Sequence, residues 1–244
     1  MKRLISIAVA LSTLSAVSAF AADFPIKAPP LPQISNAYPT SKCGFYYGIA
    51  AEGGSGIVNG APAGTVQVGG DIGGLVGYAC PVASIPFFAQ FKAEFQNLNA
   101  VNAGFALRGP AHFEELFAVQ TPLVSWLAGY INLGQNNIPA VVPLLPPGVS
   151  TVGQPQNYIG LSITQDDISA SFAGGSNKDW LNSFGVRTGL LQNIQGPNGV
   201  KAVADVFAEI NFQSTPLGCL AIGGGNIGCP KLGDRFLAGI ELKM

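Results

Sequence analysis

Apolar and polar residues alternate along two stretches of the chain. In the first, 200–213, apolar residues occupy every even position, and most residues between them are polar or charged. In the second, 234–244, the apolar set is Phe236, Ala238, Ile240, Leu242 and Met244. Because successive side chains of a β-strand point to opposite faces, each stretch predicts a strand with one apolar and one polar face. Each is as long as the ~9–11 residues that a tilted strand needs to cross a bilayer.

The same alternation predicts further strands at 43–54, 66–80, 87–96 and 183–192. Two regions are ambiguous. Region 111–133 reads as one long strand or two, and 158–173 holds two short runs whose alternation slips at 165–167, which favours a tight turn or a bulge. Stretches rich in Gly, Pro, Asn and Gln predict loops at 56–64 and 134–156.

Strands with one apolar and one polar face indicate an all-β fold, a closed antiparallel up-and-down transmembrane β-barrel. Such a barrel is the one β structure that can span a membrane, with its apolar face toward lipid and its polar face toward the lumen. We expect eight strands, or ten if both ambiguous regions divide. Either even number places both chain ends on the same side, which we expect to be the periplasm.

The N-terminus predicts export. Lys2 and Arg3 precede an apolar run, 4–17, and the A-x-A sequence 19–21 follows, so residues 1–21 are expected to be a cleaved signal peptide. The next segment, 22–42, is rich in Pro and predicts an extended periplasmic spacer. The barrel is then expected to occupy 43–244, in the cell outer membrane.

Composition also favours a barrel. The chain has 48% hydrophobic residues and only 10% charged residues, where soluble domains average ~25% charged. Without Lys2 and Arg3, 10 basic and 13 acidic residues remain, a net charge of −3, which gives no basic surface for nucleic acid. The alternative is a secreted soluble β-domain that acts as a binding module. We set it second because the predicted apolar faces carry no charge.

The polar faces predict a lumen closed by ion pairs, because its charges have mixed signs. The expected lumen charges are Glu52, Asp71, Lys92, Glu94, Arg187, Lys201, Asp205, Glu209, Arg235, Glu241 and Lys243.

Four cysteines in an exported chain suggest two disulfides, with three possible connectivities. Cys219 and Cys229 bracket a short Gly-rich loop, 223–228, and are the natural pair. If Cys43 faces Cys80, the first hairpin is in a register that keeps the apolar side chains of both strands outward. Free thiols at the rim remain the alternative.

That register places two of the expected lumen carboxylates, Glu52 and Asp71, directly opposite each other. Because like charges so placed repel, either one is protonated or a cation lies between them. We expect Arg235 to bridge the two.

Candidate chemistry is sparse. His112 is the sole histidine, followed by Glu114 and Glu115, but a lone histidine at a strand end is more often structural than catalytic. Asp166 and Asp167 could bind a cation, although two acids at a turn need no ligand. No His, Cys, Asp or Glu spacing matches a zinc site, and the glycines of 223–228 lack the strand–helix context of a phosphate loop. We therefore expect no enzyme and no cofactor.

Both ends of the expected mature chain resemble a known group. The sequences at 21–25, 27–30 and 44–48, and the final strand, 236–244, are similar to the small porin-like outer-membrane proteins of alphaproteobacteria, within the wider OmpA-like and opacity-protein barrels. Four features depart from the family. Met244 stands where an aromatic residue is usual, Lys42-Cys43-Gly44 replaces Trp-Thr-Gly, and the long stretch 122–156 and the four cysteines are unusual.

The resemblance implies an outer-membrane barrel whose partners are the outer-membrane lipids and, during insertion, the assembly machinery that recognises the last strand. We expect a structural or surface-interaction role with an unknown surface partner, and weak passive diffusion of small solutes as a lesser possibility. An eight-stranded barrel is just wide enough for side chains to fill, and a general porin needs ~16–18 strands.

Overall fold

The computed structural model describes residues 43–82, 85–120, 148–172, 174–223 and 226–244, and eight of the strands in these residues close into an antiparallel barrel. The barrel strands are β1 (Gly44–Asn59), β2 (Val66–Val82), β3 (Ile85–Asn102), β4 (Phe105–Gln120), β5 (Ser150–Phe172), β6 (Gly175–Gln195), β7 (Lys201–Asn211) and β10 (Lys231–Lys243). Their order around the barrel is β1-β10-β7-β6-β5-β4-β3-β2. The predicted closed barrel of eight strands is therefore confirmed.

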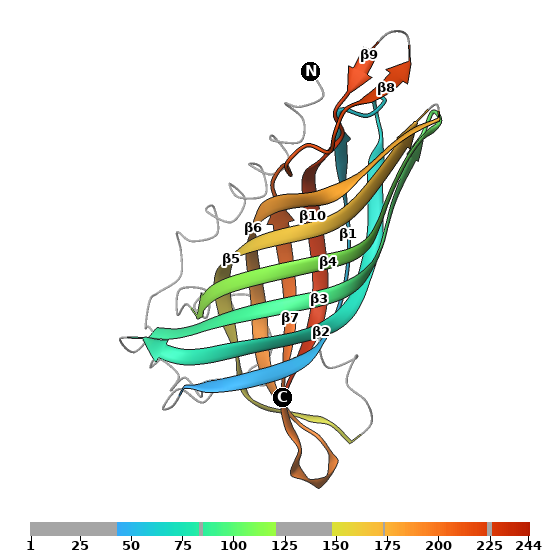
Figure 1. Cartoon of the computed structure of the whole chain (residues 1–244). Coiled ribbons are helices and arrows are strands. Elements are labelled where there is room, and N and C mark those ends of the chain that lie inside the picture. Colours follow the sequence, from blue (N-terminus) through green and yellow to red (C-terminus); the bar gives the residue numbers. More distant parts are fainter. Residues whose placement is uncertain (1–42, 83–84, 121–147, 173, 224–225) are drawn as a thin grey trace, which may run out of the picture. The chain divides into compact units, whose positions relative to one another are not determined.

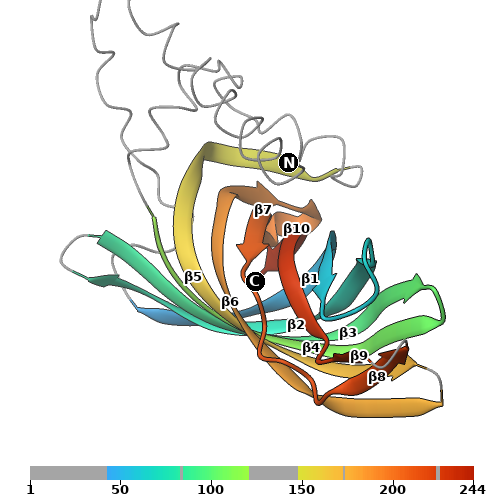
Figure 2. The same cartoon turned by 90° about the horizontal axis from the view of Figure 1, so that it is seen from above.

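Two short strands, β8 (Leu220–Gly223) and β9 (Asn226–Gly228), form a separate sheet in the connection between β7 and β10. This hairpin defines the hairpin end of the barrel, at the top of Figure 1. The first residue of β1 and the last of β10 lie at the other end, here called the terminal end, where the short helix η2 (Pro197–Gly199) joins β6 to β7. Figure 2 views the strands from above, curving around a common interior.

The strands alternate between buried and exposed side chains, as a closed sheet requires. Along β5, Tyr158, Ser162 and Asp166 are buried, and Leu161 and Ile163 are exposed. This strand pairs with β6 without a register shift from position 156 to 172. The turn or bulge predicted at 165–167 is therefore wrong, and Asp166 lies inside a continuous strand.

The irregularity lies instead in β4, where the register against β5 shifts between Arg108 and Ala111. Pro110 falls in this interval, and a proline has no N–H to donate to the ladder, so it is tolerated at a bulge.

Several strands are longer than predicted. β3 continues to Asn102, and β5 begins at Ser150, inside the segment predicted as a loop. The loop prediction is wrong from 150 to 156, because paired residues there need no apolar alternation to form a ladder. The signal peptide, 1–21, the spacer, 22–42, and the remaining ambiguous segment, 121–133, lie outside the described residues.

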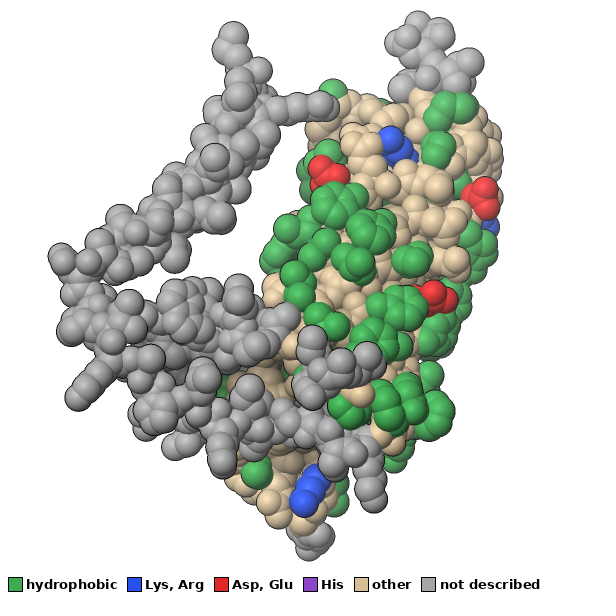
Figure 3. Space-filling view, turned by 90° about the vertical axis from the view of Figure 1, so that its left-hand side faces the viewer, with side chains coloured by type: hydrophobic (Ala, Val, Ile, Leu, Met, Phe, Trp, Pro, Cys, Tyr) green, Lys and Arg blue, Asp and Glu red, His purple; other side chains and the backbone are tan. Residues whose placement is uncertain are grey.

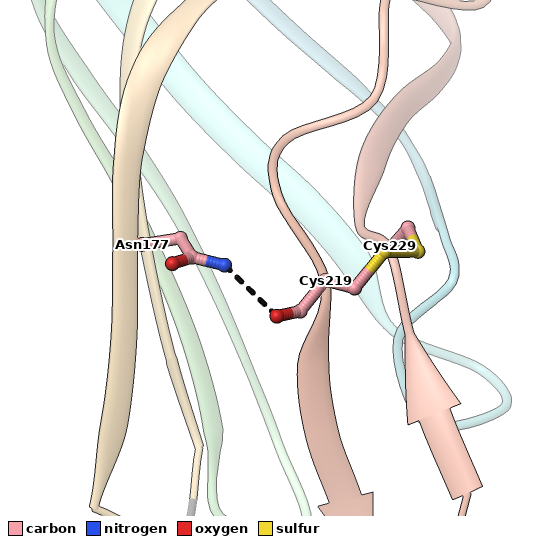
Figure 4. The surroundings of a disulfide bond; sticks show 3 residues. All are labelled: Asn177, Cys219 and Cys229. Carbon is pink, nitrogen blue, oxygen red and sulfur yellow. Dashed lines mark hydrogen bonds between the residues drawn. A yellow bond between two sulfur atoms is a disulfide. The ribbon is translucent and has the colours of Figure 1, made fainter.

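Both predicted disulfides are present, Cys43–Cys80 and Cys219–Cys229. The first accompanies the expected register of β1 and β2, in which Phe45 faces Tyr78 and Glu52 faces Asp71. The second closes the base of the β8–β9 hairpin (Figure 4). There the Asn177 side-chain amide, on β6, donates a hydrogen bond of 3.1 Å to the Cys219 carbonyl.

Large hydrophobic side chains are exposed on the outside of the barrel, and Figure 3 shows groups of them on one face. Phe45 is 88% exposed, Phe95 82% and Ile72 64%. Exposed charges interrupt them, which corrects the expectation of an uncharged apolar face. Glu115 is exposed on β4, paired laterally with Phe91 and Ile163.

Inside the barrel, two apolar clusters occupy opposite ends. The terminal cluster consists of Tyr46, Ala50, Leu75, Ala79, Phe88, Leu116, Ala118, Tyr158, Leu191, Val203 and Phe207. The hairpin cluster consists of Val58, Leu98, Ala100, Phe105, Leu107, Ile168, Ala170, Leu181, Leu217, Leu220 and Leu232. Along β4 the interior side chains of His112 and Glu114 fall between residues of the two clusters, so a charged layer separates them.

Candidate functional site

The interior of the barrel collects most of the charged side chains in the described residues. The structure buries ten of the eleven predicted lumen charges: Glu52, Asp71, Lys92, Glu94, Arg187, Asp205, Glu209, Arg235, Glu241 and Lys243. The prediction that Lys201 faces the lumen is wrong. Lys201 is exposed at the first position of β7, opposite Gln195, where the strand leaves the enclosed part of the barrel.

Arg187 is the centre of one ion-pair network. Its guanidinium is fully buried and donates to Glu209 at 2.6 Å, to Glu241 at 2.8 Å and to Glu114. Its face lies 3.7 Å from the centroid of the Phe207 ring, a cation–π contact. The planar fork of arginine suits this position, since it can serve three carboxylates from one rigid group.

Two lysines extend the network. Lys92 contacts Glu52, and its ammonium lies 2.8 Å from Glu114 and 3.1 Å from Glu94. Lys243 lies 2.7 Å from Asp205 and 3.0 Å from Glu241, among the aromatic rings of the terminal cluster. The charged layer is thus one connected set of ion pairs across the interior.

Arg235 does not bridge Glu52 and Asp71, so this prediction is wrong. It donates to Asp166 at 2.8 and 3.1 Å. In the register of β1 and β10, Arg235 faces Gly56, four positions along β1 from Glu52 toward the hairpin end. The carboxylate within its reach comes from β5 across the interior.

Glycines facing inward make room for these long side chains. Gly239 lies opposite Glu52, and a Cβ on it would come 2.7 Å from the Glu52 Cβ and 2.6 Å from the Phe207 ring. A Cβ on Gly185 would come 2.9 Å from a Glu209 carboxylate oxygen. Close approach, and not backbone flexibility, explains glycine at these positions.

Three residues that face the interior were not among the lumen charges expected from the sequence. His112 and Asp166 are fully buried and Glu114 is 1% exposed. His112 Nδ1 donates to Asp166 at 2.9 Å. The alternation gave little indication of the inward position of His112 because the β4 bulge lies just before it. In β4, odd-numbered residues point inward before the bulge, and even-numbered residues point inward after it. Reading 158–170 as one alternating strand would have placed Asp166 inward.

We predict that Arg235→Ala lowers the free energy of unfolding by about 3 kcal/mol or more, because it leaves buried Asp166 without its cation. Adding Asp166→Asn should restore much of the loss, since it removes the unpaired charge. Adding Glu52→Gln instead should not. Thermal unfolding of the three variants in detergent measures this, and equal rescue by the two substitutions would contradict the pairing.

No family model and no curated protein sequence matches this chain. Among solved structures, it is similar to Neisserial surface protein A, with 10% identity, a TM-score of 0.35, and coverage of 83% of this chain and 99% of that one. It is also similar to Ail, the attachment invasion locus protein of Yersinia pestis, with 11% identity, a TM-score of 0.36, and coverage of 83% and 97%.

Proposed function

We propose that this chain is an integral protein of the cell outer membrane that carries out a non-enzymatic surface-interaction role. Residues 1–21 would direct export and be removed. The outer-membrane lipids and, during insertion, the assembly machinery would be its partners. Among the described residues, no helix is long and apolar enough to cross a membrane.

The observation that carries the proposal is the inverted distribution of side chains. Arg187, Lys92 and Glu241 are fully buried, whereas Phe45, Ile72 and other large apolar side chains are exposed. In water, exposed apolar surface on this scale is unfavourable at about 25 cal/mol per Å². In a bilayer the same surface faces hydrocarbon and the ion pairs remain shielded, which favours the membrane over the soluble binding module.

Orientation follows from the first and last barrel strands. The start of β1 and the end of β10 both lie at the terminal end, so export and insertion in the usual manner of bacterial barrels would put that end in the periplasm. The hairpin end, with Cys219–Cys229, would then face the cell exterior. Disulfides persist in such an oxidising compartment. We assign the surface interaction to this end because the hairpin held by the disulfide is a preorganised feature there.

Passive diffusion of solutes receives no support from the interior. Two apolar clusters and the ion pairs between them fill the part of the barrel that the structure describes. The interior of an eight-stranded barrel is just wide enough for side chains to fill or for one small ligand, and not for an open channel. We therefore propose a closed scaffold in place of a pore.

Epitope insertion tests the orientation. A tag after Gly104, in the turn between β3 and β4 at the hairpin end, should be labelled by antibody on intact cells. The matched tag after Gly199, between β6 and β7 at the terminal end, should be labelled only after the outer membrane is permeabilised. Labelling of the Gly199 tag alone on intact cells would contradict the proposed exterior end.

A further inference from the structure

We propose that the interior of this barrel holds a divalent transition-metal ion, of the Zn²⁺ class, on Glu52, Asp71, Glu94 and His112. One ligand atom from each of these residues lies within 4.8 Å of all the others, and each residue is buried. They come from four consecutive strands of the barrel, β1, β2, β3 and β4. A bound ion would cross-link all four from the inside.

The residues meet because the register brings them together. Glu52 faces Asp71 between β1 and β2, and Glu94 faces His112 between β3 and β4. Gly73, opposite Glu94 on β2, leaves space for the glutamate, since a Cβ there would come 2.6 Å from the Glu94 Cγ. No spacing along the chain could show this site, as each strand supplies a single ligand.

The geometry of His112 points to a ligand. Its Nδ1 donates to Asp166 at 2.9 Å, which in the neutral ring leaves Nε2 unprotonated. Nε2 is fully buried, has no hydrogen-bond partner among the described residues, and lies 3.9 Å from Glu52 Oε1. In metal-bound histidines, the ring nitrogen that does not bind the metal usually donates its N–H to a carboxylate, and this hydrogen bond orients the ring.

The carboxylates also offer unused oxygens. Glu52 directs Oε2 to Lys92, whereas its Oε1, on the side of His112, has no hydrogen-bond partner within the described part of the chain. Neither oxygen of Glu94 has one there, although Lys92 lies 3.1 Å away. An ion on the His112 side would thus give a partner to the oxygens of Glu52 and Glu94 that make no hydrogen bond with Lys92.

The charge balance of the interior supports a cation. Among the described residues, the buried inward carboxylates are Glu52, Asp71, Glu94, Glu114, Asp166, Asp205, Glu209 and Glu241. The buried cations are Lys92, Arg187, Arg235 and Lys243. Eight acids against four bases leave an excess of four negative charges when every carboxylate is ionised and His112 is neutral. Buried charge of one sign is unfavourable unless it is neutralised, and a divalent ion halves this excess.

The ligand types select the metal. Carboxylates alone would suit Ca²⁺ or Mg²⁺, but an imidazole nitrogen favours ions such as Zn²⁺. A small cavity lined by Asp71, Gln96, Arg235 and several glycines lies beside the site, on its hairpin side.

Zinc binding to the full-length folded protein, purified without a histidine tag, tests the proposal. We expect the wild type to retain about one Zn²⁺ after dialysis, even against excess Ca²⁺, and to unfold at a higher temperature with Zn²⁺ than with a chelator. Glu94→Gln and His112→Gln should bind Zn²⁺ at least about tenfold more weakly. Asp205→Asn, which removes a buried carboxylate outside the cluster, should bind as the wild type does.

A second measurement needs no variant. Because His112 is the chain's single histidine, imidazole scattering in the zinc K-edge spectrum of the loaded wild type would come from this residue. We expect one imidazole nitrogen and several oxygens around the ion. No zinc retained by folded protein, displacement by Ca²⁺, a spectrum without imidazole, or equal binding by the cluster variants and Asp205→Asn would each overturn the proposal.

Discussion

Arg187→Met is expected to lower the free energy of unfolding by about 3–5 kcal/mol, the loss typical when one partner of a buried ion pair is removed. The methionine fills similar space but leaves Glu114, Glu209 and Glu241 without the guanidinium that joins them. Urea unfolding of the barrel in lipid vesicles, followed by tryptophan fluorescence, measures the change.

Arg108→Met is the matched control. Arg108 is exposed on β4, so the same substitution there should change stability by no more than about 0.5 kcal/mol. Adding Glu209→Gln to Arg187→Met should restore part of the loss by removing one unpaired carboxylate. If Arg187→Met were as mild as Arg108→Met, the ion-pair network would not be what closes the interior.

Leu161→Arg tests the outward face. Leu161 is 51% exposed on β5, between Ile159 and Ile163 along the strand and between Phe117 and Val186 on the neighbouring strands. An arginine on the lipid face costs about 2–4 kcal/mol near the middle of the bilayer. We expect a marked fall in the amount of assembled protein in the outer membrane.

Ser171→Arg provides the comparison on the same strand and the same face. Ser171 is exposed ten positions nearer the hairpin end, in the turn region where β5 meets β6. Outside the hydrocarbon layer the arginine costs about 0–1 kcal/mol, so membrane yield should be close to that of the wild type. Equal yields for the two variants would show that Leu161 does not face lipid.

The first hairpin shows what the sequence could predict. The register of β1 and β2, with Glu52 opposite Asp71, follows from two constraints that agree, the Cys43–Cys80 disulfide and the outward placement of the apolar side chains. A slip of one residue would have turned the apolar side chains of one strand inward, and the disulfide selects among the registers that keep them outward, so the two constraints together determine the pairing.

The interior pairing could not be predicted in the same way. Arg235 contacts Asp166 across the barrel, and this choice depends on how the closed sheet brings β10 and β5 face to face. Local alternation carries no information on contacts through the interior. The β4 bulge further hid His112 and Glu114, because the extra residue changes which positions point inward.

The most direct test of the account is the migration of the protein from fractionated cells. We predict that it is found in the outer-membrane fraction, is released by detergent, and migrates differently on gels before and after heating, since a closed barrel resists unfolding until heated. Recovery in the soluble periplasmic fraction, with one migration position regardless of heating, would contradict a membrane-spanning barrel.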